Sequence, residues 1–370
     1  MKLLLCSVFP LILLFSVFSI ASVFAESGQA VVYSSSGDGI TVFYADAETG
    51  KLKEVQNIEE KGLMAITRDQ RQMYAIGATR IFTYEIQANG HLKDLSSVDI
   101  EHGGVSYFDL DKSDRFLAAS NYGKGTVTVW PIGDDGIAQG KPSAHLTLEQ
   151  KSHSSVFVPN NDYLLVPATG PNKVFQLKFD VATGKLEPND PPSASAPVGE
   201  GDAQQPRHLI FHPDGKTVYT TLERELPGVG VWKWDAKKGS LKVVQNIVTN
   251  PEGFEGVITT ADLHLTPNAK FLYVSNRDIT DRKAVEGASS IVGFKVDQES
   301  GRLEMIGDTP CEQVPRSFAI DRAGKFLYVA GQTAAKLGVY QIDQKTGALT
   351  RVQQLNTGPS PNWIECVTLK

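Results

Sequence analysis

The amino-acid sequence predicts an all-β protein, a seven-bladed β-propeller in which a C-terminal strand completes the first blade. The main observation is an internal repeat. Its three clear copies are PRHLIFHPDGKTVY ending at Tyr219, ADLHLTPNAKFLY ending at Tyr273 and PRSFAIDRAGKFLY ending at Tyr328. Weaker copies end at four further positions, which are Tyr33, Tyr74, Ala118 and Leu165. The steps between these marks run from 41 to 55 residues, and strand-rich repeats of that length are typical of propeller blades.

The copy that ends at Tyr219 has the strand and turn pattern of one blade. Short strands are expected at 208–212 and 217–222, separated by the type I turn residues Pro-Asp-Gly. Alternating apolar residues predict a third strand at 229–235 and, after Lys-Gly-Ser, a fourth at 241–247. Four antiparallel strands are the content of one propeller blade.

The two ends of the chain complement each other. Residues 31–35 match the second strand of a blade that lacks its first strand, and residues 362–369 form a lone apolar strand with no partner after it. If the last strand supplies the missing inner strand, the ring closes without an unpaired sheet edge. Two irregular segments, 278–289 and the proline-rich 188–203, are expected to be loops within this single domain, which spans 26–370.

The first 25 residues differ from the rest. A positive start at Lys2 precedes an almost wholly apolar run from Leu3 to Ser22, and the segment ends in a small residue at Ala25. This pattern predicts a secretory signal peptide over 1–25, cleaved before Glu26, and an exported chain that is periplasmic or secreted. An uncleaved anchor is the alternative, since the apolar run approaches the length of a membrane span.

Composition narrows the class of partner. A hydrophobic content of 41% suits a soluble domain with a core, and the formal net charge is -6 without any Lys/Arg run. Nucleic acid is therefore not an expected partner. After signal cleavage no contact with the membrane is expected, and a ring with a closed seam needs no second subunit, so a monomer is expected.

Cysteine usage gives little evidence for a disulfide or a metal. Cys6 lies in the predicted signal peptide, which leaves Cys311 and Cys366. A bridge needs Cα atoms within about 7 Å, and two half-buried free thiols are favoured over a bridge. Neither cysteine has the partner spacing of a zinc or redox motif.

Polar residues concentrate at two positions of the repeat. In some blades the first strand begins at a polar residue, where other blades have Gly62 or Ala261; these polar residues are His153, Arg207 and Arg316. The second strand of several blades ends at a polar residue, where other blades have Gly37 or Ala78; these are Tyr122, Glu223, Arg277 and Gln332. Because the two strands are antiparallel, both positions lie on one face of the ring, around its axis.

The charge of this predicted cluster favours an anionic ligand. Arg–Glu pairs between blades can simply hold loops together, but three guanidinium groups with one obvious carboxylate leave positive charge over. Asp262 and His264 are expected on one side of their strand, deeper in the channel. His208 and Asp262 also suit packing roles, and Asn121 suits either role. The remaining polar repeat positions, at His212 and Asp321, are expected to stabilise turns on the opposite face.

From about residue 31 to the C-terminus the chain resembles the seven-bladed lactonase propellers, a family that includes bacterial 6-phosphogluconolactonase and fungal carboxymuconate lactonising enzyme. The most specific pieces are SNYG at 120–123, the PRHLIFHPDG and PRSFAIDRAG segments, ADLHLTP with SNR at 275–277, and GP at 358–359 with Trp363. Their order and spacing together carry the resemblance.

The resemblance implies an active site of one His, two Arg and one Glu. By local motif these are His153 in HSSVFVPN, Arg207 in PRHL, Glu223 at the end of VYTTLE and Arg277 in SNR. The implied pocket wall adds substrate-binding candidates, which are Asn121, Tyr122, His208, Asp262, His264, Arg316 and Gln332.

Two departures border this implied pocket. Many relatives have a second His near the fourth blade's inner strand, where this chain has Lys151. Many also have an acidic residue in the following loop, where this chain has PATG at 167–170. The substrate of the family therefore does not transfer directly, and 6-phosphogluconolactone is in addition a cytosolic intermediate.

The function predicted is that of an exported hydrolase that opens a sugar lactone, with a small anionic lactone or sugar acid as ligand. Arg207 and Arg277 would bind the anion and the oxyanion, and His153 or Glu223 would act as the general base. No cofactor and no metal are expected, because the axis is mainly cationic. The alternatives are a non-catalytic propeller that binds an acidic ligand or a protein, and a carboxymuconate-type lactonising enzyme.

Overall fold

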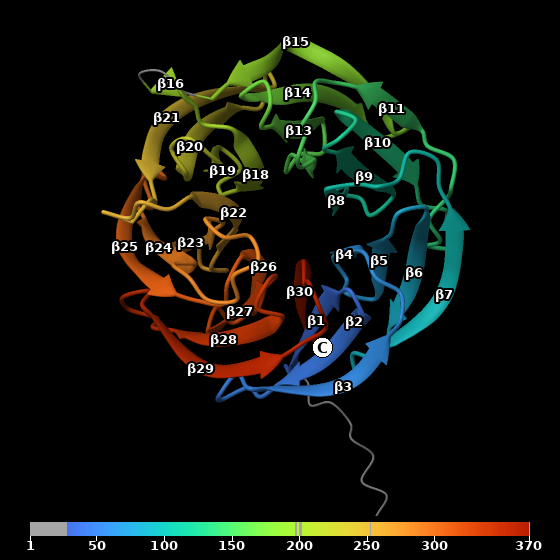
Figure 1. Cartoon of the computed structure of the whole chain (residues 1–370). Coiled ribbons are helices and arrows are strands. Elements are labelled where there is room, and N and C mark those ends of the chain that lie inside the picture. Colours follow the sequence, from blue (N-terminus) through green and yellow to red (C-terminus); the bar gives the residue numbers. More distant parts are fainter. Residues whose placement is uncertain (1–27, 197, 200–201, 252, 370) are drawn as a thin grey trace, which may run out of the picture.

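The computed structural model of the chain describes residues 28–369 except 197, 200–201 and 252. Seven four-stranded antiparallel sheets are arranged around a common axis as a β-propeller (Figure 1). The predicted signal peptide, its cleavage site and Cys6 lie outside the described residues. Within the part of the chain that is described, no helix is suited to crossing a bilayer.

The blades follow one another along the chain, each running from its inner to its outer strand. The first blade contains β30 (Trp363–Thr368), β1 (Ala30–Ser36), β2 (Gly39–Ala45) and β3 (Leu52–Ile58). The second contains β4 (Leu63–Ile66), β5 (Gln72–Ile76), β6 (Arg80–Ile86) and β7 (Leu92–Asp99). The third contains β8 (Tyr107–Leu110), β9 (Phe116–Asn121), β10 (Thr126–Pro131) and β11 (Ala144–Thr147). The fourth contains β12 (Val156–Phe157), β13 (Tyr163–Ala168), β14 (Lys173–Asp180) and β15 (Lys185–Ser195).

The last three blades have the same order. The fifth contains β18 (Pro206–Phe211), β19 (Thr217–Leu222), β20 (Gly228–Asp235) and β21 (Ser240–Val248). The sixth contains β22 (Ile258–Leu265), β23 (Phe271–Asp278), β24 (Ser290–Val296) and β25 (Leu303–Pro310). The seventh contains β26 (Pro315–Ile320), β27 (Phe326–Gly331), β28 (Lys336–Ile342) and β29 (Leu349–Asn356). The four strands predicted for the fifth blade are confirmed.

The seam closes as predicted. β30 is the innermost strand of the first blade and pairs antiparallel with β1, which places Glu365 opposite Tyr33. Chain ends that are far apart in sequence therefore share one sheet, and the first blade is complete on its inner side.

The prediction of a loop over 188–203 is wrong. Residues 188–195 belong to β15, which pairs with β14 across an irregularity in register. Two short strands, β16 (Val198–Gly199) and β17 (Asp202–Ala203), pair with each other. An outermost strand needs hydrogen bonds on one side only, so prolines are tolerated there. The carbonyl of Pro191 also accepts a hydrogen bond from Gln176 Nε2 at 2.8 Å. In the other segment, residues 279–289 are in no strand, as predicted.

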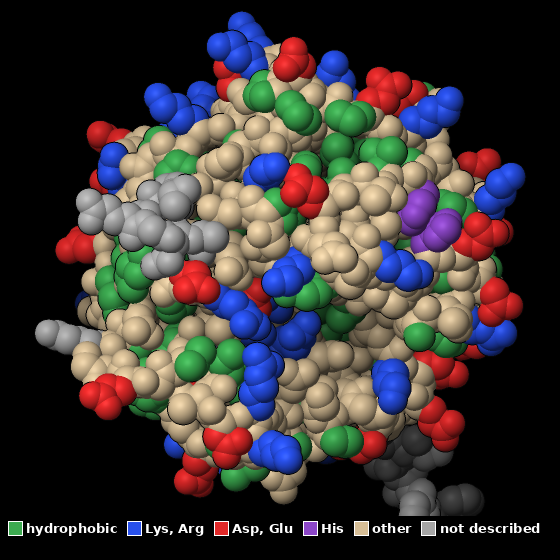
Figure 2. All heavy atoms as spheres, turned by 45° about the horizontal axis from the view of Figure 1, so that its top comes forward, with side chains coloured by type: hydrophobic (Ala, Val, Ile, Leu, Met, Phe, Trp, Pro, Cys, Tyr) green, Lys and Arg blue, Asp and Glu red, His purple; other side chains and the backbone are tan. Residues whose placement is uncertain are grey.

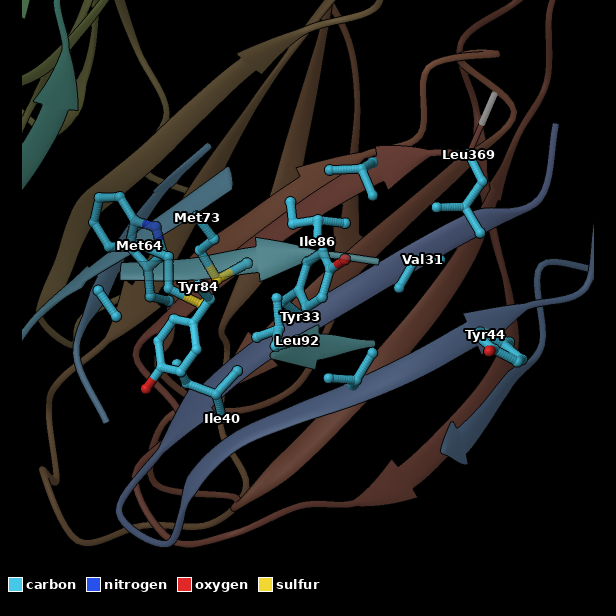
Figure 3. Packing of buried hydrophobic residues seen from close by; sticks show 14 residues of the cluster. Val31, Tyr33, Ile40, Tyr44, Met64, Met73, Tyr84, Ile86, Leu92 and Leu369 are labelled. Carbon is cyan, nitrogen blue, oxygen red and sulfur yellow. The ribbon is translucent and has the colours of Figure 1, made fainter. Parts of the chain in front are cut away.

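The tyrosines that mark the repeat join neighbouring blades. Each of four hydroxyls donates to a glycine carbonyl in the outer turn of the following blade, at 2.7 to 2.9 Å; the pairs are Tyr33–Gly90, Tyr74–Gly136, Tyr219–Gly301 and Tyr273–Gly347. Figure 3 shows Tyr33 among the apolar side chains that fill the space between the first two blades. The repeat thus fixes blade-to-blade packing as well as strand order.

The turn face holds the polar groups predicted to stabilise turns. The carboxylate of Asp321 accepts from the backbone N–H of Lys325 at 2.6 Å and of Phe326 at 2.8 Å. The ring Nδ1 of His212 accepts from the backbone N–H of Asp214 at 3.2 Å. Both roles are confirmed, and so is the prediction of two half-buried free thiols, Cys311 and Cys366.

Candidate active site

The opposite face of the ring carries a concentration of positive charge. Figure 2 shows this face with Lys and Arg side chains gathered beside the hollow at its centre. Arg207 of β18 and Arg277 of β23 supply the buried part of this positive charge, and the half-buried Arg316 of β26 adds to it. The backbone geometry is the one expected from the repeat, since the first strand of a blade begins where the second ends.

Glu223 lies between two guanidinium groups. Its Oε1 accepts a hydrogen bond from Arg277 Nη2 at 2.8 Å and lies 3.8 Å from Arg207 Nε. The three side chains are 7%, 8% and 1% exposed respectively. Burial by itself raises the pKa of Glu223, but the charges of Arg277 and Arg207 outweigh it and lower the pKa below its ordinary value. Glu223 is therefore ionised, and its carboxylate holds both arginine side chains in place.

The arginines also bond to the backbone of β22. Arg207 Nη1 donates to the carbonyl of Ala261 at 2.6 Å, and Arg277 Nη2 donates to that of Thr260 at 3.1 Å. Burial, together with Arg277 and Arg316, holds the pKa of Arg207 well below its ordinary value. Burial and Arg277 lower the pKa of Arg316 to about 10. Cations destabilise one another here, so an anion bound among them would be stabilised.

His153 packs against two aromatic rings at the edge of this cluster. Its ring lies 5.4 Å from that of Tyr122 and 5.2 Å from that of His208, centroid to centroid, both in edge-to-face geometry. Burial and then the charge of Arg207 hold the pKa of His153 well below its ordinary value. The imidazole is consequently neutral at physiological pH and has a lone pair available to accept a proton.

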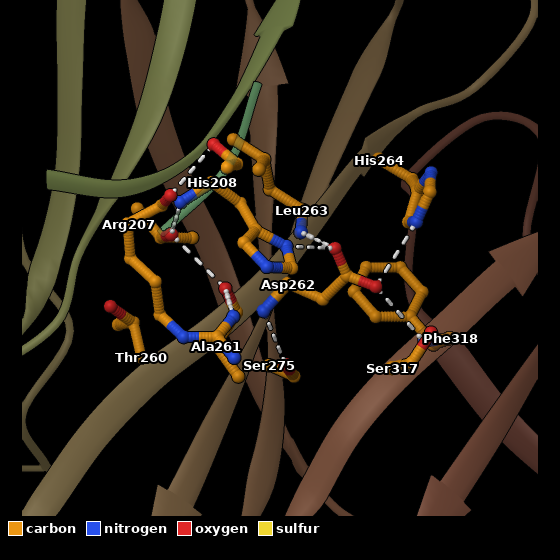
Figure 4. A network of polar contacts seen from close by, with 12 residues as sticks. Arg207, His208, Thr260, Ala261, Asp262, Leu263, His264, Ser275, Ser317 and Phe318 are labelled. Carbon is orange, nitrogen blue, oxygen red and sulfur yellow. Dashed lines mark hydrogen bonds and ion pairs between the residues drawn. The ribbon is translucent and has the colours of Figure 1, made fainter. Parts of the chain in front are cut away.

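His208, Asp262 and His264 form a connected line that starts beside Arg207 (Figure 4). His208 Nδ1 lies 2.9 Å from Asp262 Oδ1, and His264 Nε2 lies 3.3 Å from Asp262 Oδ2. Burial alone would raise the pKa of Asp262, but the His264 charge and the bond to His208 hold it well below its ordinary value. Burial and Arg207 lower the pKa of His208 to about 3, so this line contains a permanent carboxylate and a neutral imidazole.

Several buried polar atoms in this region make no hydrogen bond within the described structure. They are His153 Nδ1, Arg207 Nε, His208 Nε2, Glu223 Oε2 and Arg277 Nε. Buried polar groups of folded proteins are nearly always paired, and each exception costs about 1–3 kcal/mol. Their concentration in one place is what a site adapted to a polar ligand requires.

Two predicted substrate-binding residues make other contacts. Asn121 Nδ2 donates to the carbonyl of Gly103 at 3.0 Å and its Oδ1 accepts from the N–H of Lys124 at 2.9 Å, which shapes the turn after β9. Gln332 Nε2 donates to Ser360 Oγ at 3.3 Å, where the seventh blade meets the seam. The other predicted site residues contact one another as described above. Arg316 is connected to them through its charge interactions with Arg277, Glu223 and Tyr122.

Sequence reasoning missed an axial cavity of about 180 Å³ beside Asp262 and His264. Its wall includes Tyr107 and Asp109 of β8 and Glu365 of β30. Burial raises the pKa of Asp109 and raises that of Glu365 to about 7. The signal was a carboxylate in the middle of the inner strands β8 and β30, whereas the comparison of repeats examined strand ends. No group of His, Cys, Asp or Glu within the described residues is arranged to hold a metal ion.

Comparison with known proteins gives matches over nearly the whole chain. The family model "Lactonase, 7-bladed beta-propeller" matches residues 29–366. A 6-phosphogluconolactonase of Pectobacterium carotovorum is 32% identical over 327 residues, covering 86% of this chain and 93% of the relative. One of Yersinia pestis is 32% identical over 323 residues, covering 85% and 91%.

Solved structures agree with this match. The periplasmic gluconolactonase of Pseudomonas aeruginosa is 27% identical, with a TM-score of 0.82 over 93% of this chain and 100% of the neighbour. A Lactobacillus plantarum protein, 21% identical, has a TM-score of 0.78 over 92% of this chain and 99% of its own, and shows the shared fold.

Proposed function

Because this chain belongs to the lactonase family of seven-bladed β-propellers, we propose that it hydrolyses the ester bond of a sugar lactone. The observation that carries the proposal is the buried cluster of His153, Arg207, Glu223 and Arg277, in which each of the four side chains has an unpaired polar atom. A lactone presents a carbonyl oxygen and several hydroxyl groups, which can pair with such atoms.

Arg207 and Arg277 have the role of anion binding. Their guanidinium groups are fixed by Glu223 and by two backbone carbonyls of β22. A preorganised donor needs no reorganisation when negative charge develops on the lactone oxygen, and removing one such donor typically costs about 10²- to 10³-fold in rate. Arg316, whose charge adds to theirs, is suited to stabilise the same oxyanion and then the carboxylate of the sugar-acid product.

His153 is the better candidate for the general base. Glu223 is ionised, but its Oε1 already accepts a hydrogen bond from Arg277 Nη2 and lies 3.8 Å from Arg207 Nε. His153 is neutral and has no carboxylate bonded to its ring within the described residues, and one ring nitrogen is buried without a partner. Glu223 then orients the arginines, and His153 exchanges the proton with water.

The reaction balances with these groups alone. Water adds its oxygen to the lactone carbonyl carbon while one of its protons passes to His153. The oxyanion forms beside the guanidinium groups, the bond from the carbonyl carbon to the ring oxygen breaks, and His153 returns the proton to that oxygen. The hydroxy acid product then releases one proton to solvent as it ionises.

The compartment favours an unphosphorylated lactone. The pattern of residues 1–25 predicts export of a propeller domain spanning 26–370, and one solved relative is named a periplasmic gluconolactonase. We therefore propose an exported monomer, without a cofactor, that acts on a small sugar lactone such as an aldonolactone.

The test is lactone hydrolysis by the purified chain from Glu26 onward, followed by proton release in a pH-stat. The panel contains glucono-1,5-lactone, galactono-1,4-lactone and 6-phosphogluconolactone, with the Arg207→Ala/Glu223→Gln double variant as the matched blank. We expect turnover of at least one unphosphorylated lactone and its loss in the double variant.

Two other outcomes would change the proposal. Equal rates for both proteins and for spontaneous hydrolysis would contradict a lactonase and favour a propeller that only binds acidic ligands. Turnover of 6-phosphogluconolactone alone would retain the reaction but overturn the proposed substrate class.

A further inference from the structure

His153, His208 and Asp262 come from three different blades. His208 lies between the other two and contacts both. The rings of His153 and His208 are 5.2 Å apart in edge-to-face geometry, and His208 Nδ1 is 2.9 Å from Asp262 Oδ1. His153 Nδ1 and His208 Nε2 are both buried without a hydrogen bond. The two unsatisfied nitrogens therefore belong to two imidazole rings that are in contact with each other.

The carboxylate fixes the proton positions along this line. Asp262 Oδ1 also accepts from the N–H of Leu263 at 3.0 Å, and its Oδ2 accepts from that of Phe318 at 3.3 Å. Surrounded by donors, the carboxylate requires His208 to present Nδ1–H, which leaves a lone pair on His208 Nε2. His153 Nδ1 is buried without a partner, so its Nδ1–H tautomer is the one suited to donate to that lone pair. The free lone pair of His153 then lies on Nε2.

The charges around His153 make this arrangement important. Arg207, Arg277 and Arg316 all lower its pKa, and His208 does so too. An imidazolium at His153 therefore needs a carboxylate that is not already neutralised by arginine. Glu223 is bonded to Arg277, whereas Asp262 bonds to no arginine side chain among the described residues. One of its oxygens is paired with His264, and the other bonds to His208, whose ring contacts that of His153.

We propose that Asp262 and His208 are positioning residues that make His153 a base, by fixing its Nε2 as the proton acceptor and by stabilising the cation formed when it accepts a proton. The proposal rests on the proposed lactone hydrolysis. In the proposed chain His153 Nδ1–H donates to His208 Nε2 when His153 acts as the base, and His208 Nδ1–H donates to Asp262, as it does in the structure. In many hydrolases a carboxylate orients the histidine that acts as the base. Here the carboxylate would act on the base through one additional imidazole.

The kinetic test uses Asp262→Asn, which removes the charge and keeps the shape. We expect kcat for the best lactone to fall at least about 10²-fold with KM changed less than about threefold, because the loss affects the proton transfer and not the anion site. The matched control is Asp109→Asn, a carboxylate in the wall of the same cavity that bonds to the backbone N–H of Phe157. That variant should retain kcat within about threefold.

A kcat for Asp262→Asn within threefold of the unmodified chain would overturn the proposal, as would an equal loss in Asp109→Asn. The second variant, His208→Gln, should lose kcat to a similar degree. Thermal unfolding midpoints within a few degrees of the parent establish that each loss is not a loss of fold.

A spectroscopic readout separates this proposal from the proposed function, because it needs no turnover. In the ¹⁵N spectrum of the histidine-labelled chain, assigned with His153→Gln and His208→Gln, both rings should be neutral and protonated at Nδ1. Protonation of either ring at Nε2 would overturn the positioning role even in an active enzyme. The expected tautomers in a chain that hydrolyses no lactone would instead contradict only the proposed reaction.

Discussion

On the turn side of the fifth blade, the hydroxyl of Tyr219 donates to the carbonyl of Gly301 in the sixth blade at 2.9 Å. At the opposite end of the same two blades, Arg207 Nε and Arg277 Nε are equally buried and make no hydrogen bond. The two regions share strands and a similar degree of burial. They differ in whether the protein itself satisfies its polar atoms.

Whether its buried polar atoms are hydrogen-bonded within the protein distinguishes a residue that stabilises the ring from one that is available to bind a ligand. A buried hydrogen bond contributes about 1 kcal/mol, and an orphaned buried donor costs more than that. Natural sequences retain such costs mainly at functional sites. Variants at the tyrosine contacts should therefore change stability, and variants at the cluster should change catalysis.

The largest expected effect is in the cluster. His153→Gln should lower kcat/KM for the best lactone by about 10²- to 10⁴-fold, because the proposed general base is lost. The free energy of unfolding, measured in urea, should change little, since no hydrogen bond of the described structure ends on the His153 ring. Full activity of this variant would break the assignment of the base.

An intermediate effect is expected in the axial cavity, through pH. The pKa of Glu365 is about 7 in the folded chain and 4.5 in the unfolded chain, because burial disfavours its charge. Below pH 4.5 the group is neutral in both states. As pH rises from 4.5 to 7 the unfolded chain ionises first, and the free energy of unfolding falls by about 3 kcal/mol.

Glu365→Gln tests this because glutamine stays neutral and can still accept the Trp363 Nε1–H bond. Its thermal midpoint should exceed that of the parent at pH 8 and match it at pH 4. A midpoint difference that is the same at both pH values would show that ionisation of Glu365 is not the cause.

The smallest expected effect is at the blade contacts. Tyr219→Phe should lower the free energy of unfolding by about 1 kcal/mol and leave kcat/KM unchanged, because the Gly301 carbonyl loses its donor. Tyr328→Phe is the matched control, since that hydroxyl is buried without a hydrogen bond, and it should cost nothing or stabilise slightly. Equal losses in the two variants would remove the distinction between paired and unpaired groups.

The sequence was enough to predict the blade number and the seam strand, because alternation, turn residues and a lone C-terminal strand are all local patterns. It also predicted that His153, Arg207, Glu223 and Arg277 lie together, because position within a blade decides which face a residue joins. The tyrosine contacts were not foreseen, since each joins residues 57 to 82 positions apart.

Other features escaped prediction because their local patterns suit more than one structure. Asp109 and Glu365 sit within short inner strands, where a polar residue between apolar ones is also typical of an ordinary half-exposed strand. The prolines of β15 suggested a loop, but β15 is an outermost strand that pairs on one side only and therefore tolerates them. Asn121 has a residue type suited to ligand binding, yet backbone groups satisfy it.

The role of the buried arginines in turnover is tested by kcat/KM for the fastest lactone, measured on Arg207→Ala and on Arg224→Ala side by side. Arg207 is fully buried in the cluster, whereas Arg224 is exposed and follows the catalytic candidate Glu223 in sequence. We expect a loss of about 10²- to 10³-fold for Arg207→Ala and no change for Arg224→Ala. Retained activity in a folded Arg207→Ala chain would contradict that role.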